Sequence, residues 1–439
     1  MAVTFIDAAL LTIGVYCLWK VFTSKAKAPL PPGPKGLPLL GNIFDMPSEK
    51  EWITFTKWSE KWGDIVSVSV LGQPIVVINS MDVAIELLDR RSSINSDRPT
   101  IPMGGELVGW KNTTVLLPYG PHHRLSRKLF HQIIGTTSVM ERYHAVEEHE
   151  TRRFLRALLK SPEDFRAHVR KTAGAIILRI AYGYEVKQGE DPFVKLADEA
   201  TDQFSLSSSP GVFLVNLLPP LAYLPEWFPG AGFQKTAKKW ARTLNDMVDL
   251  PFQFVKKEMA SSAAPVSFVS SLLDQHLEDE KEFDVKWSAA SLYSGGADTT
   301  VATIDAFILA MSLFPDVQKK AQAELDRVVG TDRLPTFEDR EHLPYLNALV
   351  LETLRWHAVA PTGVAHRSQE DQFFNGYLIP KNSLIISNQW QMLHDPRVYT
   401  NPAAFEPGRF LGDQPERDPQ DACFGFGRRI CPGISTAFS

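Results

Sequence analysis

The sequence predicts a mainly α-helical protein with small β-sheets and an N-terminal transmembrane helix. Three features lead to this prediction: an almost continuous apolar stretch near the N-terminus, long segments of helical periodicity in the second half, and a few short stretches of strand character. The length of 439 residues, with 44% apolar and 22% charged side chains, fits one large globular domain.

The apolar stretch runs from Phe5 to Phe22 and is interrupted by Asp7 near one end and Lys20 near the other. At ~1.5 Å per residue it reaches roughly 27 Å, which just crosses a bilayer core. No Lys or Arg precedes it, whereas lysines close and follow it. This asymmetry predicts an uncleaved single-pass anchor with the rest of the chain in the cytosol. A buried core helix is the alternative.

Prolines and glycines crowd residues 29–38 and cannot continue a helix. They predict a stiff, extended hinge. The chain therefore divides into an anchor (1–28), this hinge (29–38) and one main domain (39–439).

Helical periodicity and stop signals define three long helices in the main domain. The first spans 284–313 and is stopped by Pro315, the second spans 316–329 and closes at Gly330, and the third spans 343–357.

Shorter alternating stretches indicate small sheets, with 65–70 pairing with 74–78 and 376–379 pairing with 384–387. The apolar stretch 212–233 is broken by prolines, which neither a spanning helix nor a core strand tolerates. We expect it to dip into a membrane surface.

Composition excludes some functions. A formal net charge of −5 argues against nucleic acid as a partner, because phosphate binding needs concentrated Lys and Arg. The three cysteines, Cys17, Cys423 and Cys431, are too few for a disulfide framework. The bulk of the chain therefore belongs in a reducing compartment.

One thiol lies in a tightly bending segment. Three glycines and a proline surround Cys431 in the run from Phe424 to Gly433, and glycine lets backbone approach a flat or bulky group. At the start of a following helix the macrodipole should lower the pKa of the Cys431 thiol. A thiolate there is a metal ligand or a nucleophile, but the segment offers only arginines and no base. An inert buried cysteine is the remaining alternative.

The segment from Gly295 to Thr300 places two adjacent glycines inside the first long helix. Each costs about 1 kcal/mol relative to alanine, so a functional reason is expected. A threonine hydroxyl bonded back to its own helix and two missing Cβ atoms would make room for a ligand. A merely flexible helix is the alternative, and the segment has no phosphate-binding Gly-Lys-Ser/Thr.

Glu352 and Arg355 carry opposite charges three residues apart on the third helix. Such a pair is usually solvated and contributes little. Its neighbours here are apolar, which favours burial, where an unpaired charge is costly.

In these residues the chain resembles the cytochrome P-450 family, whose signature Phe-x-x-Gly-x-Arg-x-Cys-x-Gly is matched at Phe424, Gly427, Arg429, Cys431 and Gly433. The resemblance implies a cytochrome P-450 fold, with the long helix over heme b and the cysteine loop beneath it. It also implies that Cys431 is the axial iron ligand and that Arg429 pairs with a heme propionate.

The same resemblance suggests roles for residues elsewhere. Thr299 would steady bound dioxygen and Asp298 would relay protons. Glu352 and Arg355 would join Arg409 to lock the core, although Gly408 stands where the family usually has Glu. Three further residues would contact the propionates: Arg127, His123 in place of the family's tryptophan, and His366.

The implied activity is a monooxygenase that inserts one oxygen atom into a hydrophobic small molecule. Electrons would come from NADPH through a partner reductase, with cytochrome b5 as a second candidate, at the endoplasmic reticulum membrane. The segments 41–47, 223–230 and 376–382 resemble a fungal secondary-metabolism branch acting on terpenoid, polyketide or indole substrates. The positions expected to line the substrate pocket are Met103, Leu107, Trp110, Leu292, Tyr293, Val359 and Val364.

The chain also departs from the family. Family members continue well past the cysteine, whereas this sequence stops at Ser439, eight residues after Cys431, so a C-terminal truncation is expected. The alternative to an active monooxygenase is a truncated remnant that binds heme weakly or not at all. A heme enzyme that works without a reductase, by dehydration or rearrangement, is a lesser possibility.

Overall fold

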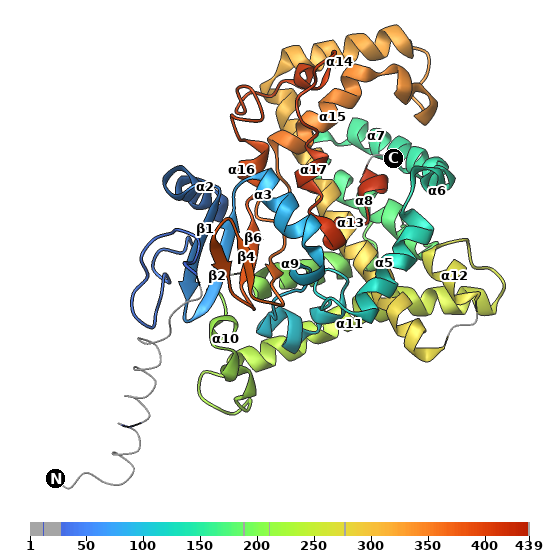
Figure 1. Ribbon diagram of the computed structural model, residues 1–439. Coiled ribbons are helices and arrows are strands. Elements are labelled where there is room, and N and C mark those ends of the chain that lie inside the picture. Colours follow the sequence, from blue (N-terminus) through green and yellow to red (C-terminus); the bar gives the residue numbers. More distant parts are fainter. Residues whose placement is uncertain (1–11, 13–27, 188, 210, 276–277, 438–439) are drawn as a thin grey trace.

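The computed structural model describes residue 12 and residues 28–437 except 188, 210 and 276–277, and it is mainly helical (Figure 1). The helices of ten or more residues are α2 (Glu51–Trp62), α5 (Pro121–Ile134), α7 (His144–Lys160), α8 (Phe165–Tyr182), α9 (Pro192–Ser208), α11 (Gly232–Ala260), α13 (Asp279–Leu313), α14 (Pro315–Val328) and α15 (Pro344–Trp356).

Shorter helices and turns connect them. The short α-helices are α3 (Met81–Ala84), α4 (Ser92–Asn95), α6 (Thr137–Met140), α10 (Leu214–Leu217), α12 (Phe268–Leu273), α16 (Gln389–Leu393), α17 (Gln420–Cys423) and α18 (Ile434–Ala437). Two π-helices, η1 (Ile85–Arg90) and η2 (Pro102–Val108), precede α5. The 3-10 helices are η3 (Trp110–Asn112), η4 (Glu141–Tyr143), η5 (Pro162–Asp164), η6 (Pro219–Tyr223), η7 (Phe337–His342), η8 (Pro407–Phe410) and η9 (Gly427–Arg429).

Two small sheets lie to one side of the helices (Figure 1). The strands are β1 (Ile65–Val70), β2 (Gln73–Ile78), β3 (His366–Arg367), β4 (Gln372–Phe374), β5 (Tyr377–Ile379) and β6 (Leu384–Ser387). The larger sheet has the order β1-β2-β6-β3, in which β6 runs parallel to β2, and the smaller sheet pairs β4 with β5. The predicted hairpin of β1 and β2 is confirmed. The predicted pairing of 376–379 with 384–387 is wrong, because these two strands belong to different sheets.

The three predicted long helices are confirmed as α13, α14 and α15. Helix α13 starts at Asp279, five residues earlier than predicted from 284. Pro315 ends α13 and is also the first residue of α14. A proline suits that position because its fixed φ is helical and its missing N–H would have had no partner there.

Helix α13 crosses the middle of the molecule and packs against α5, α8, α11 and α12 (Figure 1). Six buried side chains from its first half belong to the largest apolar cluster, which also contains side chains of α5, α8 and α11. Among the described residues, only the helix 281–313 is long and apolar enough to cross a membrane by length and composition. Because α13 packs against several other helices, it is the central helix of the domain.

Residues 1–38 contain the predicted anchor and the predicted hinge. The predicted anchor (1–28) lies almost wholly outside the described residues. The segment 29–38, predicted to be a stiff, extended hinge, lies against the sheets, since the Ser67 N–H donates to the Pro32 carbonyl at 2.9 Å and the Leu378 N–H to the Pro29 carbonyl at 2.8 Å. A Cβ on Gly33 would stand 2.0 Å from the Ser67 carbonyl oxygen, so only glycine permits this contact.

Candidate functional site

The loop that carries Cys431 is shaped by glycines. Gly425 and Gly427 have φ of 76° and 57°, in the left-handed region that favours glycine. A Cβ on Gly427 would stand 2.2 Å from the carbonyl oxygen of Leu88 in η1, so the loop can pack against η1 only with glycine there. The Cys431 N–H then donates to the Phe424 carbonyl at 2.7 Å, which closes the loop.

The Cys431 thiol is half-buried, and its surroundings differ from the expectation. Burial raises its pKa, and this outweighs the lowering by the Gly433 N–H and the Arg127 charge. The expected lowering by a helix macrodipole is therefore wrong for the thiol by itself. The reason is physical: the described part of α18 has only four residues, too short for a strong dipole, whereas burial acts fully. Arg127 also donates to the Ile430 carbonyl at 2.6 Å, which ties α5 to the loop.

Three arginines meet beside this loop with little negative charge among them. Arg98 and Arg429 are 6% and 9% exposed, and Arg127 is close to both Arg429 and Cys431. Burial, followed by mutual repulsion, lowers the pKa of Arg98 to about 9 and of Arg429 to about 10. Asp97 is nearby, but its carboxylate already accepts hydrogen bonds from Arg367 and from the Tyr119 N–H. Such a cluster favours a ligand that brings its own negative charges.

His123 and His366 border the same cluster and differ in their hydrogen bonds. The Nδ1 atom of His123 is buried and has no hydrogen-bond partner among the described residues. Burial and the neighbouring arginines lower the pKa of each histidine to about 3, so both are neutral at neutral pH. His366 donates from Nδ1 to the Asn95 carbonyl at 2.7 Å, which leaves Nε2 without a proton. His123 can therefore donate to an anionic ligand, whereas neutral His366 can only accept.

The two glycines of α13 serve different purposes. No atom lies within 4 Å of the place a Cβ on Gly295 would take, whereas a Cβ on Gly296 would stand 2.7 Å from Cδ1 of Ile177 in α8. Gly295 thus leaves space for a ligand, and Gly296 lets two helices approach. The Thr299 hydroxyl donates to the Gly295 carbonyl at 2.7 Å, which is the predicted back-bond.

A set of buried hydroxyls connects this face of α13 to α5 and the arginines. The Ser288 hydroxyl lies 2.8 Å from that of Ser126, which lies 2.6 Å from that of Thr114. The Thr114 carbonyl accepts from Arg429 at 3.2 Å. Residues 288, 295 and 299 share one face of a helix because they are spaced by about whole turns. Thr299 therefore lies on the side of α13 that faces α5, toward the elements that carry the arginines.

Asp298 contacts α8, on another side of α13. Its Oδ1 lies 3.2 Å from Nη1 of Arg170 in α8, and the same Nη1 lies 3.0 Å from Oδ1 of Asp198 in α9. One guanidinium thus bridges carboxylates from two helices. Sequence reasoning missed Arg170, because nothing in its own segment indicates a functional contact.

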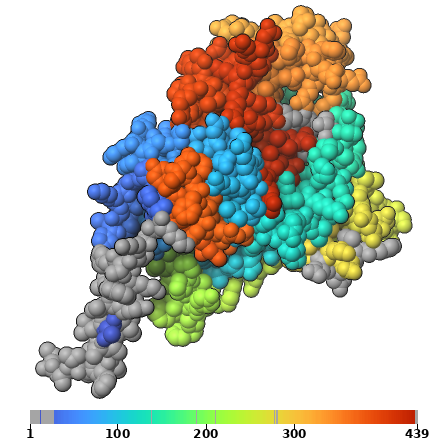
Figure 2. Space-filling model, viewed as in Figure 1, coloured from blue at the N-terminus to red at the C-terminus, as the bar shows by residue number. Residues whose placement is uncertain are grey.

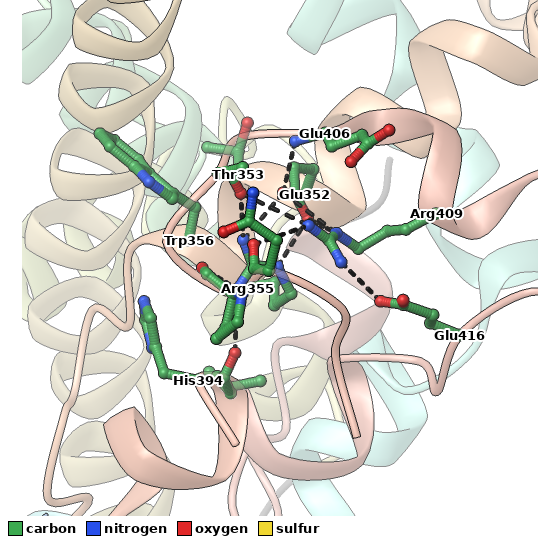
Figure 3. A network of polar contacts seen from close by, with 12 residues as sticks. Glu352, Thr353, Arg355, Trp356, His394, Glu406, Arg409 and Glu416 are labelled. Atoms are coloured by element: carbon green, nitrogen blue, oxygen red, sulfur yellow. Dashed lines mark hydrogen bonds and ion pairs between the residues drawn. The ribbon is translucent and has the colours of Figure 1, made fainter. Parts of the chain in front are cut away.

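The Glu352–Arg355 pair is fully buried, as predicted, and both side chains are 0% exposed (Figure 3). Arg355 donates to Glu352 through two nitrogens at 2.7 and 2.8 Å. Arg409 approaches the same carboxylate at 3.2 Å and also binds Glu416 at 2.6 Å. Glu416, absent from the prediction, supplies a second carboxylate, so Arg409, next to Gly408, is held by two ion pairs.

Comparison with known proteins agrees with this geometry. The family model for cytochrome P450 matches residues 31–438, which include every motif described above. The chain belongs to the cytochrome P450 family. It is 49% identical over 437 residues to cytochrome P450 monooxygenase 208 of Postia placenta, with 98% of this chain and 85% of that protein covered. It is 44% identical to cytochrome P450 monooxygenase claR of Ampulloclitocybe clavipes, with 99% and 81% covered.

The residues of this cytochrome P450 fit the heme that the family binds. Heme carries two propionates, and the cluster of Arg98, Arg127 and Arg429 needs negative charge. The unpartnered Nδ1 of His123 offers one more donor to a propionate. Among the described residues no three His, Cys, Asp or Glu side chains gather to hold a metal ion. Cys431 is the residue that would hold the iron of a bound heme, and its thiolate would donate electron density to that iron.

The structure places the predicted pocket residues of this cytochrome P450 in two groups. Met103, Trp110, Leu292 and Tyr293 are buried in the largest apolar cluster, with Leu107 packed against it. The Tyr293 hydroxyl donates to the Phe193 carbonyl at 3.3 Å, so the tip of this ring faces α9. The second group lies outside this cluster and contains Val359, which is half-buried, and Val364, which is 40% exposed.

Sequence reasoning also missed Arg98, the most buried arginine beside the cysteine loop. It donates to the Val115 carbonyl at 2.9 Å and to the Ala365 carbonyl at 2.9 Å. Its sequence context, between an aspartate and a proline, resembles an exposed turn. The proximity of Arg98 to Arg429 in the folded chain places Arg98 in the site.

Proposed function

We propose that this cytochrome P450 inserts one oxygen atom from dioxygen into a hydrophobic small molecule of fungal secondary metabolism, with a terpenoid, polyketide or indole scaffold. The observation that carries the proposal is the arrangement around α5, where the Cys431 loop, the three arginines and the hydroxyl face of α13 meet. The fungal relatives named as monooxygenases support the reaction class. The presence of the residues that carry the family's chemistry, Thr299 and Cys431 among them, favours an enzyme over a non-catalytic remnant.

Each polar group at the site has a task in this proposal. When bound, heme supplies a thiolate-ligated iron that activates dioxygen. Arg98, Arg127 and Arg429 neutralise the propionates, and His123 donates a proton to one of them in a hydrogen bond. Thr299 holds a proton at Oγ1 on the open side of Gly295. The Asp298 carboxylate takes protons from solvent, and the Arg170 guanidinium holds it in place at 3.2 Å.

The substrate proposal rests on the apolar character of the predicted pocket residues, because apolar walls select apolar ligands. The test is turnover of a panel of terpenoid, polyketide and indole compounds by the heme-loaded protein with NADPH and a P450 reductase. We expect a product that is heavier by one oxygen atom, taken from labelled dioxygen. Turnover without NADPH would instead indicate dehydration or rearrangement.

The hydroxyl of Thr299 should control how efficiently electrons are used. Thr299→Ala should retain heme, while product formed per NADPH falls roughly ten- to hundredfold and peroxide release rises, because proton delivery is misdirected. Thr300→Ala is the matched control, since Thr300 makes the same back-bond, to the Gly296 carbonyl at 2.7 Å, on a neighbouring face. Equal coupling in the Thr299 variant and the unmodified enzyme would contradict the assigned task.

The electron donor is proposed to be NADPH–cytochrome P450 reductase, with cytochrome b5 as a second donor. Exposed cationic side chains surround the surface beside the cysteine loop: Arg124 and Lys128 on α5, Arg142 on η4, and Arg428. In Figure 2 the red C-terminal segment lies at the surface of this face, next to the teal segment that contains α5 to α7. Such a patch would attract an acidic donor and shorten the electron path to Cys431.

We further propose that the protein is a single-pass protein of the endoplasmic reticulum membrane, with its catalytic domain in the cytosol. The connection between α9 and α11 supports a second membrane contact. Its described residues form the short α10 and η6 and no other helix or strand, and its exposed apolar side chains include Leu214 (65%), Leu218 (47%), Tyr223 (91%), Trp227 (81%) and Phe228 (43%). Exposed aromatic and leucine side chains of this kind insert at lipid interfaces.

Removing residues 1–28 should therefore release the protein from membranes only in part. In vesicle flotation at low salt, we expect a fraction of the shortened protein to stay with lipid. Changing Leu214 and Trp227 to serine in that shortened protein should release the rest, because the interfacial apolar area is lost. Complete release by the truncation alone would rule out the second contact.

A further inference from the structure

One side-chain amide, that of Asn216 in α10, joins two helix ends that are distant in sequence. Its Oδ1 accepts from the Met103 N–H at 2.9 Å, and its Nδ2 donates to the Ser207 carbonyl at 2.8 Å. Met103 lies in the first turn of η2, and Ser207 lies in the last turn of α9. First N–H groups and last carbonyls lack partners within their own helices, so this amide satisfies one of each. Asparagine suits the position because its amide both accepts and donates.

The seam between η2 and α9 is closely packed beside this amide. A Cβ on Gly104 would stand 2.5 Å from Oγ of Ser207 and 3.3 Å from its Cβ. Next to this contact, the rings of Trp110 and Phe204 pack with their centroids 4.6 Å apart. Hydrogen bonds and close packing therefore hold the same seam shut.

The seam separates buried apolar side chains from exposed ones. Behind it, Met103 and Trp110 are 0% and 2% exposed, in the cluster that also contains Leu292. In front of it, Leu214 and Leu218, two residues to either side of Asn216, are 65% and 47% exposed. The Asn216 hydrogen bonds therefore join η2, α9 and α10 where exposed apolar side chains give way to buried ones.

We propose that Asn216 is the latch of this seam and sets how fast an apolar substrate enters and leaves. The proposal rests on the proposed function in one respect, that such a substrate binds behind η2. The latch stabilises the closed state with and without substrate. Its loss therefore raises the entry and exit rates together and leaves the affinity nearly unchanged.

Asn216→Leu tests the latch, because it keeps the side-chain size and removes both hydrogen bonds. Two measurements are made on the heme-loaded protein: hydrogen exchange of the Met103 amide, and stopped-flow binding of 4-phenylimidazole, an aromatic nitrogen base that shifts the Soret band. We expect Met103 exchange and both rate constants to rise about tenfold, the effect of losing one to two hydrogen bonds. The dissociation constant should change by less than about threefold, because both rates rise together.

Gln234→Leu is the matched control. The Gln234 amide lies at the start of α11 and donates to the Ala222 carbonyl at 2.8 Å and the Leu224 carbonyl at 3.3 Å, so these two hydrogen bonds hold the same connection and neither goes to η2. It should leave Met103 exchange and both rates unchanged. Equal acceleration by this control would overturn the latch, because general loosening would explain both variants.

Gly104→Ala opens the seam from the η2 side and leaves Asn216 intact. This variant tests the latch if Asn216→Leu does not fold. It should raise both rates by pushing η2 from Ser207. Unchanged exchange and unchanged rates in the folded variant would overturn the proposal. If unmodified protein gives no Soret shift with 4-phenylimidazole, the proposed heme function fails. Met103 exchange in Gly104→Ala, which keeps the Asn216 acceptor, then still decides the latch.

Discussion

Replacing Cys431 with serine should abolish the red-shifted Soret band of the ferrous carbon monoxide complex and reduce monooxygenase turnover to background. A serine hydroxyl has nearly the size of the thiol, so the loop closed by the Cys431 N–H bond to Phe424 should persist. A hydroxyl does not become an anionic ligand near neutral pH, however, and iron loses the electron donation that favours O–O cleavage. The effect should therefore be spectroscopic and catalytic while the fold remains.

Cys423→Ser is the matched control, because Cys423 is the other half-buried free thiol among the described cysteines. Burial raises the pKa of Cys423, and its side chain packs against the apolar cluster that contains Phe426. This variant should keep the red-shifted band and most of the turnover. A normal band in the Cys431 variant, or its loss in the Cys423 variant, would show that the axial ligand is misassigned.

Two of the contacts predicted from sequence lie within one short segment. Thr299 bonds back to Gly295 four residues earlier, and Arg355 binds Glu352 three residues earlier. Helical spacing places such pairs on one face whatever the rest of the chain does. A pattern read along the sequence is therefore enough to pair them.

Two of the residues that were missed, Arg98 and Arg170, depend on contacts between distant segments. Arg170 reaches carboxylates 28 and 128 residues away, at Asp198 and Asp298. Strand pairing fails for the same reason: β6 has clear strand character, but its partner Ile75 lies on β2, more than 300 residues from Leu384. Alternation of apolar residues indicates that a strand exists, but it does not indicate which strand is its partner.

The pKa of the Cys431 thiol shows a third limit of prediction from sequence. The position of Cys431 before a helix predicts a lower pKa, whereas its burial raises it. Sequence contains the helix signal but not the degree of burial, and burial is the larger of the two effects here.

The second large effect concerns stability, and Glu352→Gln should produce it. Glu352 is 0% exposed and accepts from Arg355, from Arg409 and, at 2.7 Å, from the Glu406 N–H (Figure 3). Glutamine keeps the shape but removes the charge, and Arg355 is then left buried without a counter-charge. Breaking a buried pair in this way costs about 3–5 kcal/mol. The lower free energy of unfolding should appear as a lower urea midpoint and as heme loss at lower urea.

Two further variants show whether burial is the cause. Glu148→Gln removes an exposed helical pair with Arg152, at 2.9 Å, and should cost less than about 0.5 kcal/mol. Glu416→Gln should cost an intermediate amount, about 1.5–3 kcal/mol, because Arg409 loses one charged hydrogen bond and keeps Glu352. Burial alone would lower the pKa of Arg409, but Glu416 and Glu352 raise it, so both carboxylates contribute. If all three variants unfold at the same urea concentration as unmodified protein, the network around Glu352 does not hold the core together.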